Sequence, residues 1–277
     1  MTADLRGRAA IVTGATRGIG RACALALARE GVDVAVAGKS TEERPNLPGT
    51  VFSVAREIES LGARALPVAC DVRDREQVAA LVAATVERFG RLDILVCNAG
   101  AMWWRPVLET PAKRFDLMMQ VNVEHAFFAS REAIPHMRRG GWGHIVTMSP
   151  PVDLRWLPGH VAYCISKLGM TMLALGLAEE LRGEGVAVNA LWPVTIIESQ
   201  ASINHALGEP STWRTAEIVA DALVAIVRHE PAELTGRALL DEPFLRSLGV
   251  SDFARYSVVP GSTPPPLEEL WGRARRH

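Results

Sequence analysis

The sequence has few of the features that mark whole classes of protein. Its 277 residues include four scattered cysteines, which form neither Cys-x-x-Cys pairs nor a disulfide framework. No apolar run approaches the ~18 residues of a transmembrane helix, and the early charges of the N-terminus are unlike a signal peptide. A net charge of −1 offers no basic field for nucleic acid or for an anionic membrane. We therefore expect a soluble, cytoplasmic protein with reduced thiols.

Short β-branched runs alternate with longer helical patterns along most of the chain. The runs lack in–out alternation, as expected for strands buried on both faces of a parallel sheet. This order predicts an α/β fold, a single doubly wound Rossmann domain over residues 1–242 with about seven strands flanked by helices. Residues 243–277 are irregular and proline-rich, and we interpret them as a C-terminal extension. The predicted strands are 9–14, 32–38, 63–72, 92–100, 144–149, 186–193 and 237–241.

The first predicted strand enters a glycine-rich turn, "TGATRGIG", that opens directly into a helix. Such a turn lets backbone N–H groups approach a pyrophosphate, which the helix N-terminus also stabilises. Arg17 lies inside the turn, where a cation could meet an anionic cofactor group. The alternative is a glycine turn that holds no ligand. The predicted cofactor-binding residues are Thr13, Gly14, Ala15, Thr16, Arg17, Gly18, Ile19 and Gly20.

The end of the second strand bears on which dinucleotide fits. NAD binders usually place a carboxylate there to bind the ribose 2′-hydroxyl. This sequence has Lys39 and Ser40 instead, with no carboxylate until Glu42. Lys39 and Arg17 would attract a 2′-phosphate, so we predict that NADP(H) is preferred over NAD(H). Lys39 could otherwise be an ordinary exposed lysine in a loop.

The stretch "SPPVDLRWLPGHVAYCISK" contains one of only two tyrosines and one of only three lysines. Tyr163 and Lys167 stand four apart and would share one face of a helix. A free phenol has a pKa near ~10, and a nearby ammonium lowers the pKa toward the range useful for proton transfer. The spacing therefore indicates a catalytic site that includes Ser149. The alternative is a proline-broken loop followed by a helix whose Tyr and Lys only pack.

Taken in order, "TGATRGIG", "CNAG", Asn122, Ser149 and "YCISK" resemble the short-chain dehydrogenase/reductase family over residues 5–242. The resemblance implies that Tyr163 is the acid/base, that Lys167 binds the nicotinamide ribose, and that Ser149 holds the substrate oxygen. Asn122 would anchor a water that relays protons, although it could be a core amide, and Ser149 could merely cap a strand. Further cofactor contacts would come from Asp71, Val72, Asn98, Ala99, Gly100, Pro193 and Thr195.

A narrower resemblance is carried by "AGKSTEERPNLPGT", "LMMQVN", "MSPPVDL" and "AEELRGEGVAVNALWPVT". These segments are similar to the hydroxysteroid dehydrogenase-like protein 2 subgroup, in which Ser-Pro-Pro and Trp-Pro-x-Thr are usual. Relatives in this subgroup often carry a sterol-carrier domain and a peroxisomal tail. This sequence shows neither, so we do not expect lipid transfer or a peroxisomal location.

Aromatic and apolar residues follow several strand ends, where such sheets bind ligands. They predict a pocket for an apolar carbonyl or alcohol, unless these loops simply pack against the extension. The resemblance also implies a lid at residues 195–213 and a homodimer or homotetramer formed through the helices of Asn122 and Tyr163. The predicted substrate residues are Trp103, Trp104, Leu154, Trp156, Leu157 and Trp192.

These observations predict an NADP(H)-dependent oxidoreductase that interconverts a carbonyl and an alcohol, with no metal and no nucleic-acid partner. The alternative from another class is a dinucleotide-binding sensor or partner-binding protein that turns nothing over. The complete set of Asn122, Ser149, Tyr163 and Lys167 argues against this alternative, because a sensor needs no acid/base. Enoyl reduction is disfavoured because its usual Tyr-to-Lys separation is wider than four.

Overall fold

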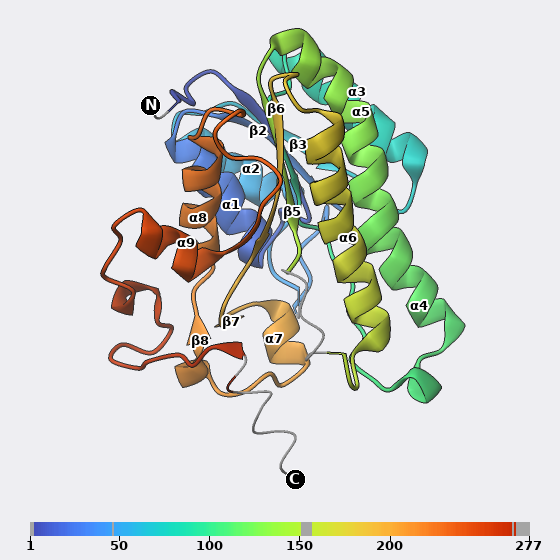
Figure 1. Ribbon diagram of the computed structural model, residues 1–277, viewed down its shortest axis with the longest axis vertical. Coiled ribbons are helices and arrows are strands. Elements are labelled where there is room, and N and C mark those ends of the chain that lie inside the picture. Colours follow the sequence, from blue (N-terminus) through green and yellow to red (C-terminus); the bar gives the residue numbers. More distant parts are fainter. Residues whose placement is uncertain (1–2, 46, 151–156, 268, 270–277) are drawn as a thin grey trace.

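The computed structural model describes residues 3–45, 47–150, 157–267 and 269. Its centre is a seven-stranded, entirely parallel sheet in the order β3-β2-β1-β4-β5-β6-β9 (Figure 1), which confirms the predicted doubly wound Rossmann architecture. Most strand residues are buried on both faces, which explains why the sequence shows no alternation. The strands are β1 Ala9–Thr13, β2 Asp33–Gly38, β3 Ala65–Ala69, β4 Ile94–Cys97, β5 Gly143–Met148, β6 Val186–Trp192 and β9 Ala238–Leu240.

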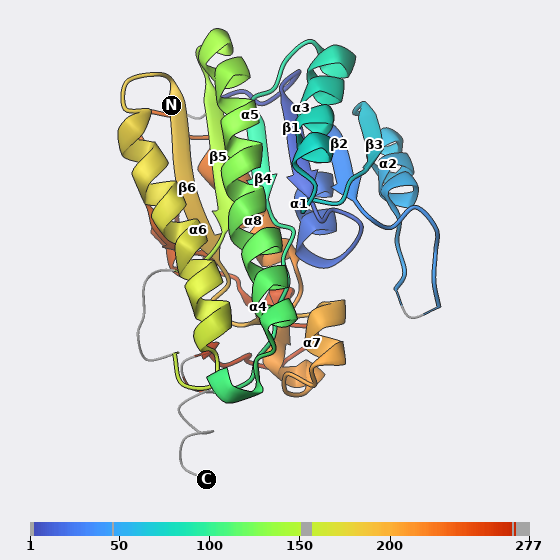
Figure 2. The same cartoon turned by 90° about the vertical axis from the view of Figure 1, so that its right-hand side faces the viewer.

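Helices cover both faces of the sheet and divide the apolar core in two (Figures 1 and 2). One layer contains α1, α2 and α8, and the other contains α3, α5 and α6. A turn of π-helix, η2 Met119–Glu124, lies between α4 and α5. The helices are α1 Gly18–Arg29, α2 Val51–Ser60, α3 Arg75–Phe89, α4 Ala112–Met118, α5 His125–Gly140, α6 Val161–Glu180 and α8 Glu217–Val227.

The carboxyl end of the sheet is covered by segments that follow β6 (Figure 1, bottom). The predicted lid, residues 195–213, is ordered into regular elements, and β7 pairs in parallel with β8. The chain then returns through α8 and β9 to a last short helix, α9. These smaller elements are β7 Ile196–Ile197, α7 Gln200–Asn204, η4 Pro210–Thr212, β8 Trp213–Arg214, α9 Asp241–Ser247 and η5 Ala254–Tyr256, with η1 Val107–Glu109 before α4.

The residues beyond β9 pack onto these covering segments. Residue 242, where we placed the end of the main domain, lies inside α9. Val258 N donates to Trp213 O at 3.1 Å and Thr215 N donates to Tyr256 O at 2.7 Å, so the extension runs beside β8. Leu267 N donates to Val194 O at 2.8 Å, directly after β6. The division at 242 stays a prediction, but backbone hydrogen bonds tie the extension to the end of the sheet where ligands bind.

One described helix, α6, is long and apolar enough to cross a membrane by length and composition alone. A core helix of a globular protein meets the same test. In this fold α6 packs against β5 and β6, and it buries the polar residues Ser166, Lys167 and Thr171. We therefore interpret α6 as a core helix.

Candidate active site

The glycine-rich turn after β1 is held against the end of β4 by backbone-directed hydrogen bonds. Thr13 Oγ1 accepts from Asn98 N and from Ala99 N, each at 3.1 Å, and Asn98 Nδ2 donates to Thr13 O at 2.9 Å. A Cβ at Gly20 would lie 2.4 Å from Gly14 O, and Gly14 itself has a φ of +64°. The glycines are therefore required for the turn and the first helical turn to pack this closely.

The N-terminus of α1 has no side-chain cap. Its N-cap residue, Arg17, makes no capping hydrogen bond, so the first N–H groups of the helix remain without a side-chain acceptor. Together with the left-handed Gly18, at a φ of +53°, this forms a cradle that fits a pyrophosphate. The predicted cofactor-binding segment runs from the end of β1 through the turn into the first residues of α1. It consists of Thr13, Gly14, Ala15, Thr16, Arg17, Gly18, Ile19 and Gly20.

Arg17 bonds to the loop after β2, and its contact with a cofactor stays a prediction. Its guanidinium donates to Ser40 Oγ at 2.9 Å, to Pro48 O at 2.9 Å and to Gly49 O at 3.1 Å. These bonds fasten the loop after β2 onto the glycine turn. Arg17 thus holds the loop that carries Lys39 and Ser40, and its donors are already engaged by carbonyl and hydroxyl oxygens.

Lys39 and Asp71 meet at the ends of β2 and β3. Lys39 Nζ lies 3.1 Å from Asp71 Oδ2, and Arg73 Nε donates to Asp71 Oδ1 at 3.0 Å. Hydrogen bonds from Arg73 and then from Lys39 hold the pKa of Asp71 well below its usual range. Asp71, which we expected to contact adenine, therefore carries two cations, and the neighbouring Val72 is buried.

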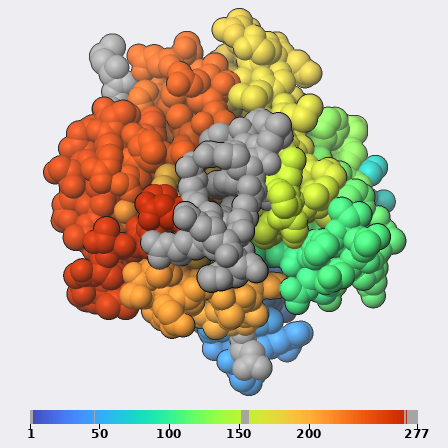
Figure 3. All heavy atoms as spheres, turned by 60° about the horizontal axis from the view of Figure 1, so that its bottom comes forward, coloured from blue at the N-terminus to red at the C-terminus, as the bar shows by residue number. Residues whose placement is uncertain are grey.

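Figure 3 looks onto the end of the sheet where the predicted catalytic residues lie. Ser149 follows β5 and is fully buried; its hydroxyl lies 2.9 Å from Thr147 Oγ1. Lys167 reaches across from α6, and its Nζ donates to Met148 O at 2.8 Å. The structure thus brings the ammonium to the residue that precedes Ser149.

Asn122 lies in the π-helical turn and is fully buried. Its Nδ2 donates to Ser166 Oγ at 2.8 Å and to Ala101 O at 2.9 Å, while its Oδ1 accepts from Ala101 N at 2.8 Å. A Cβ at Gly100 would lie 3.7 Å from both Asn122 Oδ1 and Lys167 Nζ. Asn122 therefore joins the segment after β4 to α6, beside the lysine. Its amide also bonds to backbone atoms of Ala101, as a structural amide in the core would.

Tyr163 lies in the first turn of α6 and is partly buried. The Trp104 ring stands edge-on to the Tyr163 ring, with centroids 5.8 Å apart. Burial raises the pKa of Tyr163 above its usual value. The lowering of this pKa by the Lys167 ammonium during the reaction stays a prediction.

The loop after β6 is fixed from both sides. Val194 N donates to Asp241 Oδ1 at 2.9 Å, and Val194 O accepts from Leu267 N. The next residue, Thr195, is 2% exposed, and its Oγ1 has no hydrogen-bond partner within the described ranges. A buried hydroxyl without a partner at this position fits the predicted contact of Thr195 with a cofactor. Pro193 begins the same loop.

The structure places the predicted substrate residues in different surroundings. Trp104 lies against Tyr163 as expected, whereas Trp103 is held further out by Arg114, which stacks over its ring at 4.6 Å. Trp192 lies beneath Lys167, whose Nζ is 5.3 Å from the centroid of its ring. Leu157 is partly buried just before α6. Leu154 and Trp156 lie outside the described residues.

Three residues of the site were not anticipated from the sequence. Ser166 accepts from Asn122, Asp241 accepts from Val194, and Leu267 donates to Val194. Ser166 stands directly before Lys167, which is the one available signal, but neither Asp241 nor Leu267 belongs to a local pattern. Their roles arise from contacts between segments far apart in the chain.

The comparisons with known proteins agree with this geometry. Residues 8–206 match the family described as short chain dehydrogenase. The chain belongs to the short-chain dehydrogenase family. It is 44% identical over 263 residues, 94% of its length, to hydroxysteroid dehydrogenase-like protein 2 of Rattus norvegicus, of which it spans only 50%. The structure also resembles that of a dehydrogenase from Xanthomonas campestris, with a TM-score of 0.91 and 42% identity over 95% of this chain and 98% of that one.

Two more distant members of the family have known structures with dinucleotides. A short chain dehydrogenase from Mycobacterium paratuberculosis, bound to NAD, has a TM-score of 0.75 and 25% identity over 88% of this chain and 100% of that one. A metagenomic short-chain oxidoreductase in complex with NADP has a TM-score of 0.72 and 28% identity over 86% and 98%. Together with the glycine turn, they support a nicotinamide dinucleotide as the cofactor here.

Proposed function

We propose that this chain is an NADP(H)-dependent oxidoreductase that interconverts a carbonyl and an alcohol on an apolar substrate. The observation that carries the proposal is the position of Lys167. Its ammonium touches the residue before Ser149, adjoins Gly100 and Asn122, and lies one helical turn from Tyr163. A lysine is rarely buried in an ordinary core, and its position beside these residues is typical of a functional site.

The cofactor would be held by the turn from Thr13 to Gly20, by Asn98 to Gly100 and by Thr195. When bound, the nicotinamide supplies or accepts the hydride. Tyr163 then gives a proton to the substrate oxygen during reduction, or removes it during oxidation, while Ser149 holds that oxygen. Lys167 favours the phenolate electrostatically, and Asn122 fixes α6 beside the segment after β4 so that this geometry is maintained.

Lys39 and Ser40 support a preference for NADP(H). Both lie at the end of β2, where an acidic side chain would favour NAD. The Arg17 guanidinium orients this loop, and Arg73 adds a second cation beside Asp71. A 2′-phosphate would therefore approach a surface whose single carboxylate is already ion-paired.

Trp104 supports an apolar substrate. Its indole stands beside Tyr163 and also lies edge-on to His160, with centroids 5.1 Å apart. This places an aromatic wall next to the acid/base. The hydroxysteroid name of the relatives refers to those proteins, and the wall is equally suited to other apolar ketones.

The experiment is NADPH consumption against a panel of apolar aldehydes and ketones, with Tyr163→Phe measured beside the wild type. We expect turnover that falls at least ~100-fold in the variant, because the general acid is lost. NADPH affinity should stay within about twofold. A sensor would bind NADPH and show no turnover on any carbonyl, and an equally active Tyr163→Phe protein would contradict the assigned mechanism.

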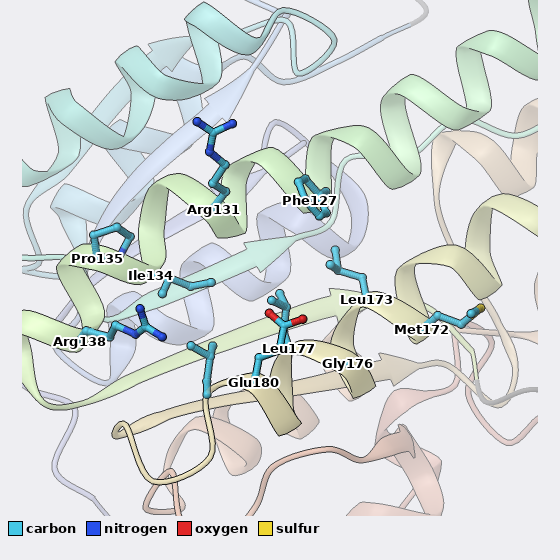
Figure 4. Close-up of a pocket in the computed structure, with 11 residues that line it drawn as sticks. Phe127, Arg131, Ile134, Pro135, Arg138, Met172, Leu173, Gly176, Leu177 and Glu180 are labelled. Carbon is cyan, nitrogen blue, oxygen red and sulfur yellow. The ribbon is translucent and has the colours of Figure 1, made fainter.

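We also propose that two or four copies associate through α5 and α6. These helices leave Phe127 49% exposed and Met172 70% exposed beside a cavity of about 540 Å³, with Arg131 and Glu180 near its edge (Figure 4). An exposed apolar patch of this kind is typical of an interface. Met172→Lys should shift the sedimentation coefficient to that of a smaller species, and a monomeric wild type would contradict this proposal.

The cytoplasm is our proposed location. Cys23, Cys70 and Cys97 are free thiols and are buried, as in proteins of a reducing compartment. Fractionation of cells that produce the protein would test the location directly.

A further inference from the structure

Lys167, the proposed catalytic lysine, is buried. Lys167 is 5% exposed, and across residues 3–45, 47–150, 157–267 and 269 no ion pair joins its ammonium to an acidic side chain. Burial lowers the pKa of Lys167 to about 8. Some other group must therefore stabilise the ammonium if it is to remain charged during the reaction.

Within the described residues, the Lys167 ammonium interacts with a backbone carbonyl, a thioether and an indole ring. Met148 O accepts from Nζ at 2.8 Å, Met170 Sδ lies 3.7 Å away, and the Trp192 ring centroid lies 5.3 Å away. The carbonyl satisfies one of the three N–H donors, and a thioether is a weak acceptor. The indole face is the only one of the three that attracts a cation over a whole surface, and tryptophan does so more strongly than other aromatic residues.

Trp192 is placed to act on the lysine because it ends β6, the neighbour of β5, from which Met148 is contributed. Leu191, the residue before it, pairs with Met148 across the two strands. The indole Nε1 is buried and has no hydrogen-bond partner within the described ranges. The ring is therefore held by packing rather than by its N–H group.

We propose that Trp192 is a positioning residue for Lys167, whose ammonium it holds charged and in place through the face of its indole. The inference deepens the proposed function and rests on it, since the charge of Lys167 matters only if the lysine takes part. The role in substrate binding that we expected for Trp192 stays a prediction, and the contact with Lys167 is an additional role for the same ring.

The decisive experiment measures the ionisation of Lys167 without substrate or cofactor. The chain has only three lysines, Lys39, Lys113 and Lys167, so ¹³Cε-labelled lysine gives three NMR signals, assigned with Lys→Arg variants. Among the described residues, His125 interacts electrostatically with Lys167, and Tyr163 lies one helical turn before it on α6. His125 has a pKa lowered to about 4 by burial, and burial raises the pKa of Tyr163, so neither changes charge near pH 8.

Tryptophan analogues of one shape provide the matched series. Site-specific fluorotryptophans at position 192 withdraw electron density from the indole face while the side chain keeps almost the same volume. We expect the titration midpoint of Lys167 to fall stepwise with each added fluorine, and to fall by roughly 0.5 to 1 pH unit in Trp192→Leu. Trp192→Phe, which retains a weaker aromatic face, should lie between Leu and the wild type.

An unchanged or raised midpoint in the fluorinated series would overturn the proposal, because it would show that the ring only fills space. If Trp192→Leu does not fold, the fluorinated proteins still give the answer. The measurement also separates the two proposals. A midpoint that falls as expected in a protein inactive toward every carbonyl would contradict the proposed function and leave the contact between Trp192 and Lys167 established.

Discussion

The glycine-rich turn packs closely against the end of β4 through hydrogen bonds of Thr13 and Asn98 to backbone atoms, whereas the Lys167 end is held by larger side chains from three separate elements. In the first region, Gly14 and Gly20 allow β1, α1 and β4 to approach closely. In the second, Asn122, Lys167 and Trp192 come from η2, α6 and β6. The first region is thus specified by a local sequence pattern and tolerates no added atoms. The second contains a buried charge, which should reduce stability.

The largest effect should follow from adding one methyl group to the turn. A Cβ at Gly20 would lie 2.4 Å from Gly14 O and 2.5 Å from Asn98 Nδ2. Gly20→Ala should therefore displace α1 from the turn and weaken NADPH binding at least ~100-fold, since a displaced helix N-terminus no longer faces the pyrophosphate. Isothermal titration calorimetry measures this directly.

Gly140→Ala is the matched control, because a Cβ there has nothing within 4 Å and Gly140 ends α5. NADPH affinity in this control should equal that of the wild type. Equal affinity in Gly20→Ala as well would show that the turn does not bind the dinucleotide.

In the second region, replacing the buried lysine should stabilise the folded protein. Because the folded pKa of Lys167, about 8, lies below the unfolded value of 10.5, charging the lysine disfavours the folded state below pH 8. This penalty fades as the pH rises from 8 to 10.5. Lys167→Met, which keeps the length of the side chain, should therefore raise the free energy of unfolding at pH 7 by about 2 kcal/mol and abolish activity. Urea denaturation at pH 7 and pH 10 measures the change.

Lys113→Met is the control, because Lys113 is exposed and its replacement should change the free energy of unfolding by less than ~0.5 kcal/mol. A destabilised Lys167→Met protein would mean that the lysine contributes more through its contacts than its burial costs. The comparison between the two regions would then fail.

The local pattern of the first region explains how much of the molecule was predictable. The positions of the strands, the glycine turn and the helical spacing of Tyr163 and Lys167 follow from residues close in sequence, and the structure has them as expected. The hydrogen bonds of Arg17 to the loop at 48–49 and the position of Trp192 beneath Lys167 depend on how distant segments meet. Single-sequence patterns do not encode such contacts, so neither contact was predicted.

The smallest effect concerns the choice of dinucleotide. Lys39→Asp would place a second carboxylate beside Asp71, which should repel a 2′-phosphate and reduce the preference for NADPH over NADH at least ~10-fold. The ratio of the two dissociation constants measures this preference. Lys113→Asp, on α4, is the matched charge change and should leave the ratio unaltered. An unaltered ratio in Lys39→Asp would show that Lys39 does not contribute to the choice of cofactor.

The central claim is that hydride and proton are delivered at the Tyr163 end of α6. NADPH deuterated at C4 of the nicotinamide, incubated with a pool of apolar ketones, tests it by mass spectrometry of the products. The account predicts an alcohol heavier by one deuterium with the wild-type protein, and a yield at least ~100-fold lower with Tyr163→Phe. Deuterated alcohol formed equally by both proteins would contradict it.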